Sequence, residues 1–164
     1  MVSYLTSPLG TIRITGDKSG VLAISCLDDP MPDLPLPVGL PAPLQAAHEQ
    51  LTAYFNGERH TFDFAINPIG TEFQRRVWEA LLTVPFGKTA SYLELSRQLG
   101  DEKAIRAVAA ANGRNPLAIV VPCHRIIGSN GSLTGYAGGL WRKQWLLEHE
   151  GSRQKSPAGQ LALF

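Results

Sequence analysis

The chain has 164 residues, of which 44% are hydrophobic and 18% are charged, and its formal net charge is +1. This composition is typical of a globular protein that buries a sizeable core, and it excludes collagen-like and low-complexity chains. No apolar run approaches the roughly 20 residues of a membrane span, and the N-terminus lacks the features of a signal peptide. The two cysteines, Cys26 and Cys123, do not make a disulfide framework, so we expect a cytoplasmic protein with reduced thiols.

The first 66 residues predict a small α+β unit. Residues 10–16 and 21–27 indicate a hairpin, because apolar and polar side chains alternate on both sides of a glycine-containing turn. A proline-rich loop follows. A helix is expected over residues 43–56, where the apolar side chains share one face, and another strand over residues 61–66.

A domain boundary is expected at residues 67–70, and the charge balance changes there. Residues 1–70 carry 3 basic and 7 acidic side chains, whereas residues 71–164 carry 12 and 7. A basic surface suits a phosphate backbone, although chance segregation of charge explains the same distribution.

Helices and turns dominate the basic part. Three helices are expected, each after a capping residue: one to about residue 82 after Thr71, one over 92–99 after Ser91, and one over 102–111 after Asp101. The second and third resemble a helix-turn-helix, a pattern that two ordinary core helices also produce. The later elements are expected to be a strand over 117–121, a turn at 129–132, a glycine-rich loop over 134–139, a helix over 140–149 and a polar tail.

The segment Pro122-Cys123-His124-Arg125 carries the chemistry. Its β-branched apolar flanks predict that Cys123 lies between buried strands. Neighbouring positive charge lowers a cysteine pKa, and the thiolate is the reactive species. A cysteine beside a histidine can be a nucleophile with its base or half of a metal site. The third interpretation, a structural cysteine, would leave His124 and Arg125 as costly buried groups without a purpose.

A zinc site is not expected. The two cysteines and four histidines show no Cys-x-x-Cys or His-x-x-x-His spacing. Cys26 alternates into a hydrophobic strand and is expected to be an inert core thiol. The prediction of reactivity therefore concerns Cys123.

On these residues the chain resembles the O6-alkylguanine-DNA alkyltransferase family. The motifs of the resemblance cover residues 71–151 and lie at 73–78, 104–108, 112–116, 119–127, 135–139 and 145–151. The resemblance implies an α+β fold with a small N-terminal α/β, ribonuclease H-like domain over 1–66, a linker at 67–70, a winged helix-turn-helix-like domain over 71–151, and a flexible tail over 152–164. It also implies irreversible transfer of the alkyl group from O6-alkylguanine, and from O4-alkylthymine, in DNA to Cys123, with no cofactor and no metal.

The resemblance implies a catalytic role for five residues. Cys123 would be the nucleophile, and His124 would be the base, joined to Cys123 through a water and directly to Glu150. Tyr92 would donate to N3 of the flipped base and press on the adjacent phosphate. Asn115 would bridge the recognition helix and the active-site strand.

The resemblance also implies how DNA and substrate are held. The pocket would be lined by Ile126, Tyr136, Ala137 and Gly138, with the Ala137 N–H group at O6 of guanine. A base inside a duplex must leave the stack before it can react, and Arg106 would fill the gap. The other DNA-binding residues would be Ala107, Ala110, Ala111 and Arg125.

The end of the tail suggests a protein partner. Gln160, Leu161, Ala162, Leu163 and Phe164 resemble the pentapeptide with which bacterial repair and replication proteins dock on the sliding clamp, here at the end of a flexible linker. The alternative is that this apolar end packs on its own domain. We expect a monomer that binds double-stranded DNA and no membrane.

Two other functions stay open at this point. One is a helix-turn-helix alkylation sensor or lesion-flagging protein, and the other is a Cys-His-Glu hydrolase. Intact Cys123 and Glu150 disfavour a pure DNA binder, whereas Arg106 beside the Pro-Cys-His-Arg motif disfavours a hydrolase.

Overall fold

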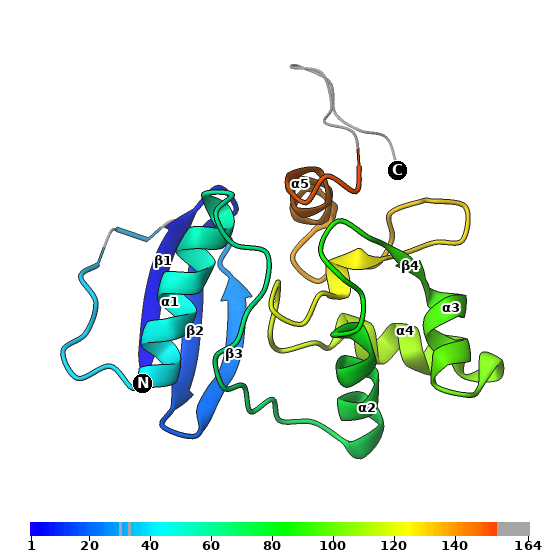
Figure 1. The fold of residues 1–164 in the computed structure, drawn as a ribbon, viewed down its shortest axis with the longest axis horizontal. Coiled ribbons are helices and arrows are strands. Elements are labelled where there is room, and N and C mark those ends of the chain that lie inside the picture. Colours follow the sequence, from blue (N-terminus) through cyan, green and yellow to red (C-terminus); the bar gives the residue numbers. More distant parts are fainter. Residues whose placement is uncertain (30, 33, 154–164) are drawn as a thin grey trace. The chain divides into compact units, whose positions relative to one another are not determined.

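The computed structural model of the protein describes residues 1–29, 31–32 and 34–153. The described residues divide into two compact units, one formed by those within 1–70 together with 116–120, and the other by 71–115 together with 121–153. Figure 1 shows the elements of each unit. Among the described residues, no helix has the length and apolar character needed to cross a membrane.

The first unit is an antiparallel sheet with a helix across one face (Figure 1). Its elements are β1 (Val2–Ser7), β2 (Gly10–Asp17), β3 (Gly20–Cys26) and α1 (Ala42–Phe55), and the strand order is β1-β2-β3. The expected hairpin is confirmed as β2 and β3. Strand β1 was not expected from the sequence, because its inward positions are Ser3 and Leu5, which give no apolar alternation.

Helix α1 packs on this sheet with the face that its periodicity predicts. Leu44, Ala47, Leu51 and Tyr54 are all fully buried. Each fully buried leucine adds about 1.5–3 kcal/mol to the free energy of unfolding, because its apolar surface is removed from water. Gly16 in β2 allows the close approach, since a Cβ there would lie 2.9 Å from Leu44 Cδ1.

The strand expected at residues 61–66 is wrong as a regular element. Only Ile66 pairs, in an isolated parallel bridge with Val21. The Val21 N–H group donates to Ala65 O at 2.9 Å, and the Asn67 N–H group donates to Val21 O at 2.8 Å. The side chains over 61–66 do alternate between exposed and half-buried positions, which is the signal that predicted a strand.

The strand expected at residues 117–121 is also wrong. Leu117 forms an isolated parallel bridge with Ile24 of β3, and the Ala118 N–H group donates to Ile24 O at 3.1 Å. The chain then leaves the extended conformation, because Ile119 has a φ of 74°. This left-handed conformation is rare for a β-branched residue, and it converts an apolar run into tight turns.

The second unit contains most of the helices. They are α2 (Glu72–Leu81), α3 (Tyr92–Gln98), the 3-10 turn η1 (Glu102–Ala104), α4 (Ile105–Gly113) and α5 (Leu140–His149). Thr71 and Ser91 cap α2 and α3 as expected, each in a capping box that satisfies two backbone N–H groups. The Trp78 Nε1–H group donates to Ala111 O at 2.9 Å and ties α2 to α4.

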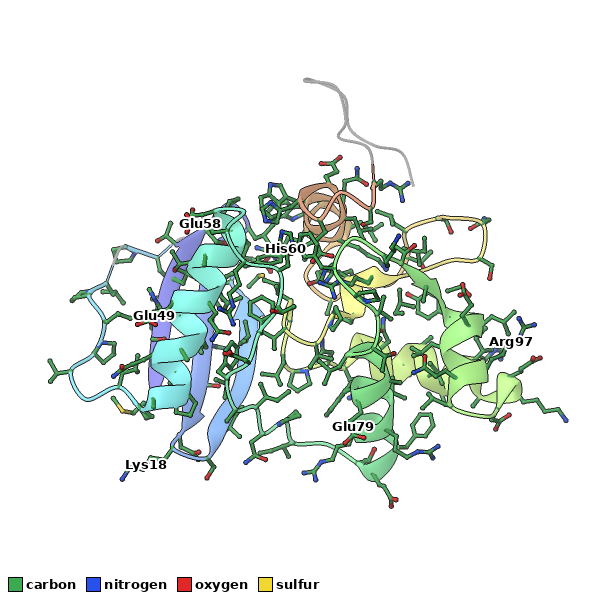
Figure 2. All side chains as sticks on the ribbon, viewed as in Figure 1. Lys18, Glu49, Glu58, His60, Glu79 and Arg97 are labelled. Carbon is green, nitrogen blue, oxygen red and sulfur yellow. The ribbon has the colours of Figure 1, made fainter. Side chains whose placement is uncertain are left out.

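A short parallel pair completes this unit. Strand β4 (Ala90–Ser91) pairs with β5 (Ile126–Ile127), and β5 directly follows the 3-10 turn η2 (Cys123–Arg125). Charged side chains such as Glu79 on α2 and Arg97 on α3 remain on the surface (Figure 2). The exposed pair of Arg97 and Glu102, 2.7 Å apart, adds little stability because water screens it.

Candidate active site

Cys123 lies in a 3-10 turn and not between strands, which corrects the expectation from its apolar flanks. Its N–H group donates to Val121 O at 2.8 Å, and the Arg125 N–H group donates to Pro122 O at 3.0 Å. Cys123 therefore lies within two consecutive tight turns of the backbone. The residue is 7% exposed, so the thiol lies just below the surface.

His124, Arg125 and Glu150 form a buried charged cluster behind Cys123. His124 Nε2 lies 2.9 Å from Glu150 Oε2. The Arg125 guanidinium donates to both carboxylate oxygens, from Nε to Oε1 at 2.8 Å and from Nη2 to Oε2 at 3.0 Å. Its Nη1 donates to Val84 O at 2.7 Å. A bidentate arginine–carboxylate pair of this kind fixes the carboxylate geometrically as well as electrostatically.

The cluster sets the protonation of its members. Burial would raise the pKa of Glu150, but hydrogen bonding and charge from His124 and Arg125 lower it to about 2. Burial lowers the pKa of His124 from 6.5, and Glu150 offsets this only in part. At neutral pH we therefore assign a neutral imidazole beside an ionised carboxylate.

The tautomer of His124 follows from its partner. A carboxylate only accepts, so the proton is assigned to Nε2. Nδ1 is then an acceptor, and among the described residues this buried atom has no hydrogen-bond partner. His124 thus has a basic nitrogen available for a proton, as the predicted base requires.

Lys143 is a site residue that the sequence analysis missed. It is fully buried, and its Nζ donates to Ile126 O at 2.6 Å and to Thr134 O at 2.8 Å. Burial lowers its pKa to about 8, and the charge of Cys123 opposes this change. The positively charged group that interacts electrostatically with Cys123 is therefore the Lys143 ammonium group on α5. A lysine on an amphipathic helix gives no sequence signal for burial, because its pattern is that of a solvent-exposed residue.

Asn115 and Tyr92 each bind a backbone carbonyl near the thiol. The Asn115 Nδ2 group donates to Val121 O at 2.7 Å, which links the end of α4 to the segment before Cys123. Tyr92 opens α3, its hydroxyl donates to Thr134 O at 3.1 Å, and its ring lies 5.9 Å from Lys143 Nζ. Both side chains thus fix the chain on either side of the thiol.

The expected pocket residues come from β5 and the glycine-rich loop. Ile126 is buried, Tyr136 and Gly138 are half-buried, and Ala137 is exposed. Ile126 O already accepts from Lys143 Nζ, and Cys123 O accepts from the Ile126 N–H group. Each carbonyl keeps a second lone pair for a substrate amine.

Two of the expected DNA contacts are corrected. Arg106, Ala107 and Ala110 are exposed on α4 as expected. Ala111 is 3% exposed and its carbonyl oxygen accepts from Trp78 of α2, so its side chain is too buried to touch DNA. Arg125 is 6% exposed and its guanidinium is held by Glu150, so its role is internal. The sequence near Arg125 could not reveal this role, because the buried carboxylate of Glu150 lies 25 residues further along the chain.

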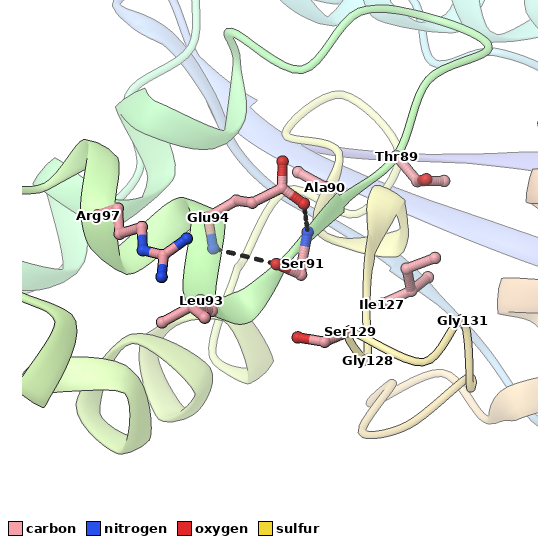
Figure 3. A pocket seen from close by; sticks show the side chains of 10 residues that line it. All are labelled: Thr89, Ala90, Ser91, Leu93, Glu94, Arg97, Ile127, Gly128, Ser129 and Gly131. Atoms are coloured by element: carbon pink, nitrogen blue, oxygen red, sulfur yellow. Dashed lines mark hydrogen bonds between the residues drawn. The ribbon is translucent and has the colours of Figure 1, made fainter.

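An open groove of about 530 Å³ lies beside these elements (Figure 3). It runs between Ser91 and Glu94 at the start of α3 and Ile127 and Ser129 after η2. Glu94 accepts from the Ser91 N–H group as part of the helix cap. None of the four expected pocket residues lines this groove. It is therefore a separate surface feature, adjacent to Tyr92 in sequence.

Two predictions concern other parts of the chain. The pentapeptide at 160–164 lies outside the described residues. Among residues 1–29, 31–32 and 34–153, no group of three or more metal-binding side chains comes together.

This arrangement suits nucleophilic substitution. A nearly buried thiol is followed by a neutral imidazole, which an ionised carboxylate orients, and a buried ammonium group lies in the same unit. A nucleophile, a base and an orienting group are the parts that covalent catalysis by cysteine requires. Exposed Arg106 and the small residues around it provide a surface that a nucleic acid could approach closely.

Family models match nearly the whole chain. The model described as "6-O-methylguanine DNA methyltransferase, ribonuclease-like domain" matches residues 1–68. The model described as "6-O-methylguanine DNA methyltransferase, DNA binding domain" matches residues 72–152. The expected order of the two domain types is thereby confirmed.

Individual relatives agree. The methylated-DNA–protein-cysteine methyltransferase of Mycobacterium tuberculosis is 47% identical over 167 residues, which cover 100% of this chain and 99% of the relative. The protein of the same name from Methanosarcina acetivorans is 46% identical over 149 residues, covering 89% and 95%. The crystal structure of Mycobacterium tuberculosis OGT in complex with DNA is similar with a TM-score of 0.80 and 46% identity, over 94% of each chain.

Proposed function

The chain belongs to the 6-O-methylguanine DNA methyltransferase family, and we propose that Cys123 is the residue that receives the alkyl group. The protein repairs DNA by direct transfer of an alkyl group to one of its own cysteines. The observation that supports Cys123 is its position in a 3-10 turn, directly before a neutral His124 that Glu150 orients. Cys26, the other cysteine, lies in β3 of the first unit.

The proposed reaction is a displacement at the alkyl carbon. The sulfur of Cys123 forms an S–C bond as the C–O6 bond breaks, and the electron pair of that bond goes to guanine. His124 takes the thiol proton at Nδ1 through a bridging water and returns one proton through water to the guanine as it leaves, so that the imidazole and the restored guanine both end neutral. Glu150 stays ionised throughout and holds the imidazole in the required tautomer. Because the thioether is stable, each molecule reacts once.

The surrounding residues are proposed to hold the lesion. Tyr92 donates to the flipped base, and the Ala137 N–H group donates to O6, where negative charge develops. Arg106 occupies the space that the flipped nucleotide leaves in the duplex. Asn115 keeps α4 and the active-site segment in register. We also propose O4-alkylthymine as a substrate, because it presents an alkylated oxygen in a similar position.

Intact-mass spectrometry after incubation with duplex DNA containing O6-methylguanine tests this proposal. The wild-type protein should gain about 14 Da, the mass of one methylene, at Cys123 and nowhere else. Cys123→Ser should gain nothing and still bind DNA, while Cys26→Ser should react normally. A label on Cys26, or repeated turnover by one molecule, would contradict the assignment. DNA binding without any transfer would favour the sensor or lesion-flagging alternative.

We further propose that the tail from Gln160 to Phe164 binds the bacterial sliding clamp. The support is its sequence: a glutamine, two leucines and a terminal phenylalanine after a polar linker. An apolar anchor of this size fits groove recognition with micromolar affinity, about −8 kcal/mol or weaker. Titration calorimetry should detect binding with the full chain and none with a chain ending at Gly159. Equal binding by both forms, or by neither, would contradict the proposal.

The remaining proposals concern the setting of the reaction. We propose a monomer that acts on DNA inside the cell, where reducing conditions keep the Cys123 thiol reactive. Transfer to short oligonucleotides should be unaffected by removal of the tail, because no residue with a chemical role lies beyond Gly151 in the proposed mechanism.

A further inference from the structure

The glycine-rich loop ends at a stacked pair of side chains that the proposed mechanism does not use. Arg142 is 4% exposed, whereas its neighbour Trp141 is 55% exposed. The guanidinium carbon of Arg142 lies 4.7 Å from the centre of the Trp141 ring, a cation–π contact. A Cβ on Gly139 would lie 3.4 Å from Trp141 Cδ1, so the indole also lies against the loop backbone.

Arg142 holds the loop at Gly138. Its Nη1 donates to Gly138 O at 2.9 Å. A Cβ on Gly138 would lie 2.9 Å from Tyr136 Cε2 and 3.3 Å from Arg142 Cδ. The backbone of Gly138 is therefore enclosed between the Tyr136 ring and the Arg142 stem. The Gly139 N–H group donates to Tyr136 O at 3.0 Å and closes the turn. Gly139 itself has a φ of 94°.

Ala137 lies between fixed points. At the start of the loop, Thr134 O accepts from Lys143 Nζ and from the Tyr92 hydroxyl. At its end, Gly138 is held by Arg142. Ala137 itself is exposed, and among the described residues its N–H group has no hydrogen-bond acceptor. The Ala137 N–H group belongs to the same peptide as Tyr136 O, which accepts from the Gly139 N–H group. That Gly139 N–H group belongs in turn to the same peptide as Gly138 O, the acceptor of Arg142. Arg142 therefore sets the direction of the Ala137 donor through the Gly138–Gly139 peptide.

We propose that Arg142 and Trp141 are positioning residues that aim the Ala137 N–H group at O6 of the alkylated guanine. The inference rests on the proposed function, in which this N–H group stabilises the charge that develops on the leaving oxygen. Trp141 acts through Arg142: its ring keeps the guanidinium directed at Gly138 O. Preorganised donors of this kind lose much of their effect when they are displaced by a fraction of an ångström.

Trp141 offers the cleaner test, because it is exposed and its replacement leaves the core intact. Trp141→Ala should lower the single-turnover rate of methyl transfer about tenfold, less than the loss from removing an oxyanion donor outright. Trp141→Phe keeps a ring for Arg142 and should restore the rate to within about twofold. The Kd for methylated duplex should not change. Leu82→Ala, which removes another exposed apolar side chain of this unit, is the matched control and should react like wild type.

Two substrates separate positioning from other roles. The free base O6-benzylguanine should show the same loss as duplex DNA, whereas a loss with duplex alone would make Trp141 a DNA contact and overturn the inference. DNA containing S6-methyl-6-thioguanine should show a much smaller loss, because sulfur is a weak hydrogen-bond acceptor. Equal losses for oxygen and sulfur, or wild-type rates in Trp141→Ala, would also overturn it. A wild-type protein that is not alkylated at Cys123 would instead refute the proposed function.

Discussion

Glu150→Gln removes the carboxylate on which the buried cluster depends, and it should change the acid stability of the protein in a defined way. In the folded chain the pKa of Glu150 is about 2, compared with an ordinary value of 4.5. Because the folded pKa is the lower one, the stabilisation is complete above pH 4.5 and is lost as the pH falls toward 2. Its size follows from the difference between the two pKa values and is about 3 kcal/mol.

The amide variant should lack this pH dependence. At pH 7 it leaves the buried Arg125 guanidinium without its carboxylate, and breaking such a pair costs about 3–5 kcal/mol. The assay is urea unfolding at several pH values, followed by tryptophan fluorescence. All three tryptophans, Trp78, Trp141 and Trp145, belong to the second unit, so the signal reports on the unit that contains the cluster.

The comparison needs an exposed carboxylate as its control. Glu79→Gln on α2 should unfold like wild type at every pH. An ordinary Glu titrates between about pH 5 and pH 3. If the wild type and Glu150→Gln lose stability in parallel over that range, His124 and Arg125 do not keep the Glu150 carboxylate ionised, and the prediction is refuted.

Three further predictions concern other parts of the chain. Arg106→Ala should slow repair of duplex DNA much more than reaction with free O6-benzylguanine, because the free base needs no extrusion; equal losses would remove Arg106 from that step. Between pH 8 and 10.5 the unfolded chain keeps a proton on Lys143 that the folded chain has lost, so the stability of the wild type should rise with pH there. Lys143→Met should abolish this rise, and urea unfolding of both proteins across this pH range would detect the difference. Leu51→Ala should destabilise the first unit by about 2–5 kcal/mol through cavity formation, measured by urea unfolding followed by circular dichroism.

Local chemistry was predictable from the sequence. Thr71 and Ser91 cap their helices because a side-chain oxygen and a glutamine or glutamate three residues later satisfy backbone groups within one turn. The helix over 140–149 was likewise predicted with its observed bounds. Such elements depend on neighbours in the sequence, and no distant partner overrides them.

Long-range chemistry was not predictable. The apolar run at 117–121 has the composition of a strand, yet Ile119 turns it out of the extended conformation, and composition cannot distinguish these outcomes. Arg125 was expected at DNA, but a carboxylate from the end of α5 holds it inside. Lys143 was missed for the same reason, because its acceptors are carbonyl oxygens of Ile126 and Thr134.

The return of residues 116–120 to the first sheet affects how this chain could be divided. Ile24 on β3 exchanges backbone hydrogen bonds with that returning segment, so the sheet edge is covered by residues encoded far downstream. A fragment that stops at Gly70 would expose this edge and its hydrogen-bonding groups, which invites pairing between molecules. Gene fusions, circular permutants and split reporters built from this protein should therefore keep Pro116 to Val120 with the sheet. Dividing the sequence after Gly70 would separate this segment from the structural unit to which it belongs.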